Sequence, residues 1–258
     1  IEALLIEDRG QGRFLALAKP AKTFRVGEGI AFEGGLTARV EADLGNGQRL
    51  LRLEQPDYES RLAAVGRVPL PPYVHREIDD PERYQTVYAR QKGSAAAPTA
   101  GLHFTQEVLG SLRTKGVATA SVTLDVSLDT FRPIATDDVD HHAMHGERCT
   151  VPVETANAVA ACTGRIVAVG TTTVRTLETR ATGARIVQPG ETVSKLFIKP
   201  GFDFRITDAM FTNFHLPGTT MMLLVAALAG RENLMSAYRE AVVDGYRFLS
   251  FGDSMLVV

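Results

Sequence analysis

Residues 98–105 carry the strongest chemical signal in the sequence, because they bring a titratable ring, a stacking ring and small residues together. Thr99 and Gly101 are followed directly by His103 and Phe104. Small residues let a backbone come close to a ligand, and a histidine can exchange a proton near neutral pH. We therefore predict a ligand-binding loop with a catalytic His103. The alternative is a tight loop before a helix, with His103 hydrogen-bonded in the core.

A second cluster lies at residues 140–147, where three histidines stand among carboxylates. Such clusters suggest a metal site, but the HExxH pattern is absent and the stretch is too short to fix a geometry. We therefore expect no metal. We predict instead that His145 and Glu147 transfer a proton or orient a substrate.

A third candidate follows a hydrophobic strand, where Gly170, Thr171 and Thr172 form a turn before a helix. In parallel α/β proteins, ligands meet the carboxyl ends of strands at such turns. The hydroxyl and amide groups could bind a carboxylate, a ribose or a phosphate, and Arg175 adds a permanent charge. The GK[ST] ending of a Walker loop is absent. Plain helix capping would explain the turn equally well.

The fourth candidate is the stretch 210–220, which contains two aromatic and two polar side chains before a Pro-Gly turn. Asn213 and His215 share one face if this stretch is extended. Phe211 and Phe214 are candidates for stacking on a base or an adenine ring. The alternative is a pair of aromatic core residues followed by a capped helix.

The elements that must position these groups fall into two regions. Short strands between Gly-rich or charged turns over residues 1–53 predict a small antiparallel barrel or sandwich. Three prolines within residues 69–72 indicate a domain boundary. Strands then alternate with helices, which predicts a mostly parallel sheet covered by helices. We therefore expect an α/β fold, with a β-barrel domain at residues 1–70 and a catalytic α/β domain at residues 71–258.

Composition narrows the class of protein. The 258 residues are 45% hydrophobic and 22% charged, with a net charge of −2, which is typical of a soluble globular protein. This charge argues against a nucleic-acid binder with a basic surface throughout, but allows a local basic patch. Two cysteines without a CxxC pattern predict free thiols in a reducing compartment, so we expect a cytoplasmic protein. No apolar run approaches the roughly 20 residues of a membrane span, so we expect no membrane partner.

Seven blocks, taken in order, resemble the S-adenosylmethionine:tRNA ribosyltransferase-isomerase family of queuosine biosynthesis. They lie at residues 83–90, 98–105, 130–133, 144–147, 170–177, 212–217 and 246–256. The resemblance covers nearly the whole chain, and it implies an α/β domain with an inserted small β-barrel domain. It also implies transfer of the ribosyl part of S-adenosylmethionine onto the aminomethyl-deazaguanine wobble base of tRNA. The ribose is rearranged to an epoxycyclopentane, giving epoxyqueuosine, and adenine and methionine are released.

For that reaction, residue chemistry suggests a role for each candidate. The predicted proton-transfer residues are His103, His145 and Glu147. The predicted ring-holding residues are Phe104, Phe131 and Phe214. The predicted ligands of the methionine end are Thr171, Thr172 and Arg175. The further candidates for substrate or cofactor binding are Thr99, Gly101, Asp125, Gly170, Asn213 and His215. We expect S-adenosylmethionine as co-substrate, tRNA as partner, no metal and a monomeric protein.

Departures from the family pattern leave alternatives open. Asp125 replaces a histidine, and Ser127 and Asp129 replace glycines, in the strand usually written Leu-His-Val-Gly-x-Gly-Thr-Phe. Side chains there would obstruct a ligand and add negative charge. Gly146 stands where the family has serine, and the family pattern begins before the position of Ile1, so we expect an incomplete N-terminus. The alternatives are a divergent paralogue that acts on a small molecule or nucleoside without tRNA, and a non-catalytic tRNA-binding remnant.

Overall fold

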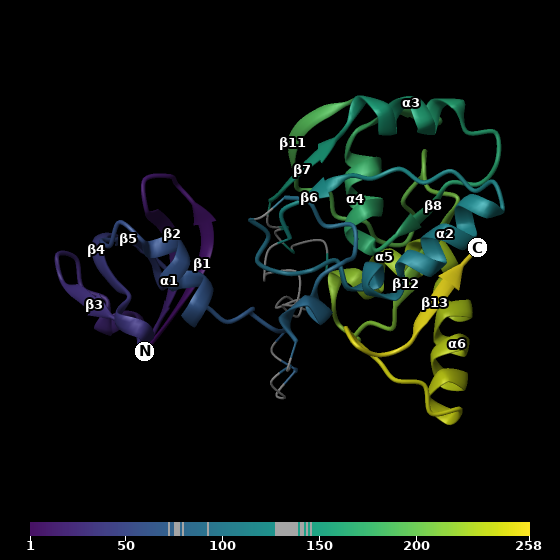
Figure 1. The fold of residues 1–258 in the computed structure, drawn as a ribbon. Helices are drawn as coiled ribbons and strands as arrows, with labels where there is room; N and C mark the ends of the chain where they lie inside the picture. Colours follow the sequence, from purple (N-terminus) through teal and green to yellow (C-terminus); the bar gives the residue numbers. More distant parts are fainter. Residues whose placement is uncertain are drawn as a thin grey trace. The chain divides into compact units, whose positions relative to one another are not determined.

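The computed structural model describes residues 1–71, 73–74, 78, 80–91, 93–126, 139, 142, 144 and 146–258. These residues form two compact units (Figure 1). The first comprises Ile1–Leu70 and a short later segment that ends at Ala95, and the second comprises Pro71–Gln91 and Ala96–Val258.

The first unit is built on one antiparallel sheet with the strand order β1-β2-β5-β4-β3. Its elements are β1 (Glu2–Asp8), β2 (Arg13–Lys19), β3 (Gly29–Ala31), β4 (Thr37–Gly45), β5 (Gln48–Leu53) and helix α1 (Tyr58–Val65). Strand β2 alternates half-buried and buried residues, as expected for a sheet with one face on a core. The core of this unit gathers Phe14, Phe24, Val40 and Leu51.

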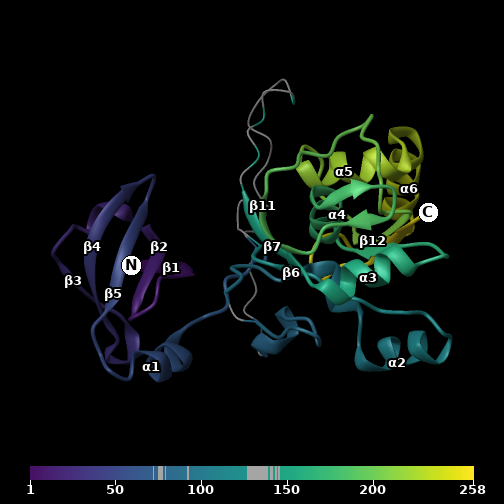
Figure 2. The ribbon, with the colours of Figure 1, turned by 90° about the horizontal axis from the view of Figure 1, so that it is seen from above.

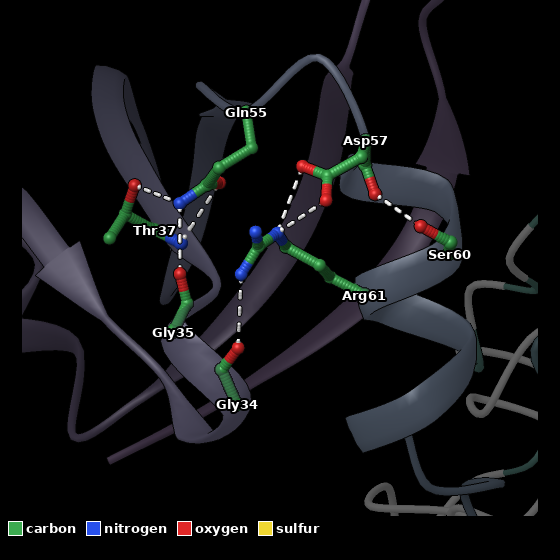
Figure 3. Close-up of polar contacts among 7 residues, drawn as sticks. All are labelled: Gly34, Gly35, Thr37, Gln55, Asp57, Ser60 and Arg61. Atoms are coloured by element: carbon green, nitrogen blue, oxygen red, sulfur yellow. Dashed lines mark hydrogen bonds and ion pairs between the residues drawn. The ribbon is translucent and has the colours of Figure 1, made fainter.

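Polar side chains fasten α1 and the turn preceding it to the start of β4 and to the loop before β4 (Figure 3). The Gln55 side chain accepts from the backbone N–H of Thr37 at 3.1 Å and donates to the Thr37 hydroxyl at 2.7 Å. Arg61 pairs with Asp57 at 2.9 Å and donates to the Gly34 carbonyl at 3.3 Å. These contacts are largely exposed, so each adds little stability by itself. Together they fix the position of the helix on its own sheet.

The second unit contains three small sheets, with strand orders β11-β7-β6, β13-β12-β8 and β10-β9. Its strands are β6 (Thr123–Leu124), β7 (Glu147–Val151), β8 (Val167–Val169), β9 (Ala181–Gly183), β10 (Ile186–Val187), β11 (Gly190–Ser194), β12 (Ala209–Asn213) and β13 (Ser254–Val257). Its helices are α2 (Gln106–Thr114), α3 (Val153–Ala161), α4 (Thr171–Thr179), α5 (Thr220–Ala229) and α6 (Arg231–Val243). A short 3-10 helix, η4, spans Thr99–His103.

The expected α/β class with a mostly parallel sheet is wrong. Among the strand pairs of the described residues, β8–β12 alone is parallel, and the others are antiparallel. The fold is therefore α+β. Helix α3 follows β7 and precedes β8, but these strands lie in different sheets. The helix therefore does not connect two parallel neighbouring strands. The order strand, helix, strand along the chain is nevertheless the order that such a connection has.

Helix α4 lies between the two cores of the second unit. Val174 packs with Met210 and Leu224 in one core, and Leu177 packs with Val159 of α3 in the other. Figure 2 shows α4 beside α5, with α6 beyond α5. Burial on both sides holds the first turn of α4 firmly in place. None of the described helices has the length and apolar character needed to cross a membrane.

Candidate functional site

The parallel pair β8–β12 positions the candidate site. Parallel strands end at the same edge of a sheet, which is where α/β structures place ligands. The Gly170 N–H, just after β8, donates to the Phe211 carbonyl in β12 at 2.8 Å. Gly170 has φ +89°, a conformation that L side chains rarely adopt, so glycine is needed at this turn. The turn brings the start of α4 next to Asn213, the last residue of β12.

The 3-10 helix η4 meets this edge through hydrogen bonds to Asn213. The Thr99 hydroxyl donates to Asn213 Oδ1 at 2.9 Å. Asn213 Nδ2 lies 3.1 Å from His103 Nε2 and donates to it. Gly101 lies between these contacts, and a Cβ there would overlap the hydroxyl of Tyr88. The structure thus joins Asn213 to His103 and Thr99, which lie 110 and 114 positions before it in the chain. The sequence had suggested these residues separately.

Aromatic rings surround His103. Its ring packs against Phe211 with centroids 5.7 Å apart, and Phe104 packs against the same ring at 5.2 Å. Partial burial lowers the pKa of His103, while Asp253 acts to raise it and Arg247 to lower it. His103 is therefore neutral near pH 7 and can accept a proton.

Phe214 belongs to the hydrophobic core, and the neighbouring His215 is also buried. Phe214 is buried and packs against Phe248 at 4.8 Å and against Tyr238 at 5.4 Å, so its ring is covered by other rings. His215 Nε2 lies 2.8 Å from the hydroxyl of Thr212, and its backbone N–H donates to the Tyr238 hydroxyl at 2.7 Å. Burial lowers the pKa of His215 to about 4. His215 is thus a neutral, hydrogen-bonded residue at the wall of the site.

Glu147 and Arg175 form a buried ion pair. Arg175 Nη1 donates to Glu147 Oε2 at 2.6 Å, and the side chains are 9% and 3% exposed, respectively. Arg175 Nε donates to the Leu196 carbonyl at 3.2 Å. Glu147, on β7, is therefore bound to a cation on α4. Arg175 in turn lines a cavity together with the predicted ligands Thr171 and Thr172.

The remaining predicted residues lie elsewhere or outside the described part. Asp125 follows β6, is half exposed and has its carboxylate 3.9 Å from the Arg148 guanidinium. The described contacts of Asp125 link it to β7, not to the edge where β8 and β12 end. Phe131 and His145 lie outside the described residues, as do Ser127 and Asp129.

Sequence analysis did not identify two residues that line a second cavity at this edge. The hydroxyls of Tyr73 and Ser250 are 2.7 Å apart, and both residues border a cavity together with Thr99, Asn213 and His215. Ser250 lies inside the block 246–256, so its position in that block was an available signal. Tyr73 follows the proline-rich connector and had no such signal. Within the described ranges, no three His, Cys, Asp or Glu side chains are grouped so that they could hold a metal ion.

One solved structure and two known sequences are similar to this chain. A crystal structure of S-adenosylmethionine tRNA ribosyltransferase from Thermotoga maritima is 37% identical, with a TM-score of 0.49, over 100% of this chain and 74% of that one.

Two relatives are named S-adenosylmethionine:tRNA ribosyltransferase-isomerase. The relative from Synechococcus elongatus is 48% identical over 100% of this chain and 75% of its own length. The relative from Symbiobacterium thermophilum is 49% identical over 100% of this chain and 77% of its own length. The sequence model of the family described as "Queuosine biosynthesis protein" matches residues 1–257. The chain therefore belongs to the queuosine biosynthesis protein family.

Proposed function

We propose that this protein is an S-adenosylmethionine:tRNA ribosyltransferase-isomerase. The observation that carries the proposal is the identity of 48–49% to enzymes of that name across the whole of this chain. The enzyme transfers the ribosyl part of S-adenosylmethionine to the aminomethyl-deazaguanine wobble base of tRNA. It rearranges the ribose to an epoxycyclopentane and releases adenine and methionine.

The proposed reaction centre is the edge where β8 and β12 end. Deprotonation of carbon next to a sulfonium needs a base in its unprotonated form, and the lowered pKa of His103 supports that role. Asn213 holds this ring by a hydrogen bond, and Thr99 in turn holds the Asn213 side chain. Phe104, which packs against Phe211 as His103 does, and Gly101 of η4 are further proposed members of the site. His145 and Phe131 remain predicted members of the site.

The contacts of two predicted residues suggest revised roles. Because Glu147 is paired with Arg175 at 2.6 Å, we assign it to positioning that guanidinium. Because Phe214 is covered by other rings, we assign it to the aromatic core, where it holds the adjacent end of β12 in position. S-adenosylmethionine is the co-substrate and tRNA with the modified wobble guanine is the partner. We further propose that the enzyme acts in the cytoplasm as a monomer, which sedimentation at several concentrations would check.

The decisive experiment is adenine release from S-adenosylmethionine under single-turnover conditions, followed by chromatography. With tRNA that carries the aminomethyl-deazaguanine base, we expect about one adenine for each tRNA modified. A matched tRNA with unmodified guanine at the wobble position should give none. Absence of adenine with both tRNAs would overturn the proposed function. Release without tRNA dependence would favour a paralogue that acts on a small molecule.

A further inference from the structure

The buried guanidinium of Arg175 has one nitrogen that no described residue contacts by a hydrogen bond. Nη1 bonds Glu147 and Nε bonds the Leu196 carbonyl. Nη2 is buried and has no hydrogen-bond partner in the part of the chain that the structure describes. A buried N–H group of a cation without an acceptor costs free energy. An acceptor supplied by a ligand would remove that cost.

The start of helix α4 faces the same cavity. Thr171 and Thr172 line it together with Arg175, and α4 is nine residues long. Its N-cap is Gly170, which offers no side-chain hydrogen bond, and the first turn contains no acidic residue. The first N–H groups of a helix and its dipole attract anions. A guanidinium nitrogen and a helix N-terminus are thus available to one anionic group.

The other walls of this cavity are mostly apolar. They are formed by Met144, Leu196, Phe197, Ile198, Met221 and Leu224, together with the polar Thr220. A phosphate has oxygens on every side and would meet these side chains unfavourably. A carboxylate at the end of a short apolar chain presents oxygens on one side and methylene groups on the other.

We infer that Arg175 Nη2 and the first turn of α4 bind the carboxylate of the methionine moiety of S-adenosylmethionine. The inference rests on the proposed function, because that function supplies the ligand. Glu147 neutralises one edge of the guanidinium and directs the free edge toward the cavity. The apolar wall then packs along the methylene groups that lead to the sulfonium. Held at this end, the substrate places its ribose toward the neighbouring β12, which carries Asn213.

Calorimetric binding with matched ligands tests the carboxylate directly. S-adenosylmethionine is compared with its decarboxylated analogue, and L-methionine with 3-(methylthio)propylamine. We expect each decarboxylated ligand to bind roughly 10- to 100-fold more weakly, as for loss of a hydrogen bond between charged groups. Equal binding within each pair would overturn the inference, and so would failure of all four ligands to bind.

Variants assign the effect to the cavity. Replacing Arg175 alone would leave Glu147 as a buried charge, so the double variant Glu147→Gln/Arg175→Gln is used, with folding checked by circular dichroism. Thr172→Val, which keeps both charges, removes a hydroxyl only. The double variant should bind both members of each ligand pair with equal affinity. Thr172→Val should reduce the difference in affinity between the two members of a pair. The control Arg185→Gln, which removes an ion pair to Asp208 at 2.9 Å elsewhere in the unit, should preserve the wild-type difference.

The outcomes also separate this inference from the proposed function. If the protein discriminates by the carboxylate but releases no adenine with modified tRNA, the subsite stands and the proposed function fails. If adenine is released while the carboxylate makes no difference to binding, the function stands and the inference fails. If the double variant loses salt-dependent tRNA binding but keeps carboxylate discrimination, Arg175 contacts a phosphate and the inference is wrong.

Discussion

Asn213 donates a hydrogen bond from Nδ2 to His103 Nε2 across 3.1 Å. On its other side, Oδ1 of this amide accepts from the Thr99 hydroxyl at 2.9 Å, and this orientation places Nδ2 at the ring. An amide oxygen only accepts and an amide nitrogen only donates. In this orientation of the amide, Nε2 of His103 accepts through its lone pair and the neutral ring has its proton on Nδ1. Protonation at Nε2 would set two donors against each other.

Asn213→Asp should raise the pKa of His103. A carboxylate can still accept from Thr99, but it now favours an N–H at Nε2 and adds a negative charge beside the ring. In the wild type, partial burial lowers that pKa. NMR titration of histidine-labelled protein measures both states. Asn233→Asp serves as the control, because Asn233 lies on the exposed side of α6 and bonds only the Ala229 carbonyl among the described residues. An unchanged His103 titration in Asn213→Asp would contradict the assigned tautomer.

The same relationship predicts a shift in the pH profile of adenine release. A protonated His103 cannot accept a proton, so activity should fall as pH falls through its pKa. Since the wild-type pKa lies below its ordinary value of 6.5, activity should persist somewhat below pH 6.5. In Asn213→Asp the acidic limb of the pH profile should move to higher pH. His103→Ala should lower the rate of adenine release by about 100- to 10,000-fold. Single-turnover rates across pH provide the measurement. Coincident profiles for wild type and Asn213→Asp would exclude His103 as the titrating base.

Local patterns in the sequence predicted where elements lie, but not which strands pair. The turns around Gly10 and Gly45–Gly47 delimit strands β1, β2, β4 and β5 close to their expected positions. By contrast, β7 pairs with β11, about forty residues later, and antiparallel to it. Helix-strand alternation carries no information on that choice, because the packing of α3 and α4 between the sheets decides it.

The candidate site was predictable in its parts and not in its contacts. The types of residue at 103 and 213 suggested chemistry, yet their hydrogen bond depends on η4 lying against the end of β12. Phe214 follows Asn213 directly, so its side chain leaves the opposite side of the backbone and enters the aromatic core. A phenylalanine that stacks on a ligand and one that packs in the core cannot be distinguished by residue type at this position. The side of the backbone from which the ring leaves distinguishes them.

Breaking the Glu147–Arg175 pair should be costly because both side chains are buried. Glu147→Ala leaves a buried guanidinium with a single protein acceptor, so we expect a loss of about 3–5 kcal/mol in the free energy of unfolding. The double variant Glu147→Ala/Arg175→Ala should lose less than the sum of the single changes. Urea denaturation measures each value. The control Arg247→Ala removes an ion pair whose arginine is 75% exposed, and it should cost less than about 1 kcal/mol. Additive losses would show that the buried pair is not coupled.

Gly101→Ala should destabilise η4 through a specific clash. The added Cβ would overlap the Tyr88 hydroxyl and come within 2.8 Å of Thr86 Cγ2. Overpacking of this kind costs about 1–3 kcal/mol, which urea denaturation would detect. Tyr88→Phe removes the atom that would overlap, so the double variant Gly101→Ala/Tyr88→Phe should recover part of the loss. Thr86 still opposes the new methyl group, and recovery should therefore be incomplete. Gly110→Ala is the matched control, because nothing lies within 4 Å of its added Cβ. If Tyr88→Phe rescued nothing, the close approach of η4 to Tyr88 would not be what makes glycine necessary at position 101.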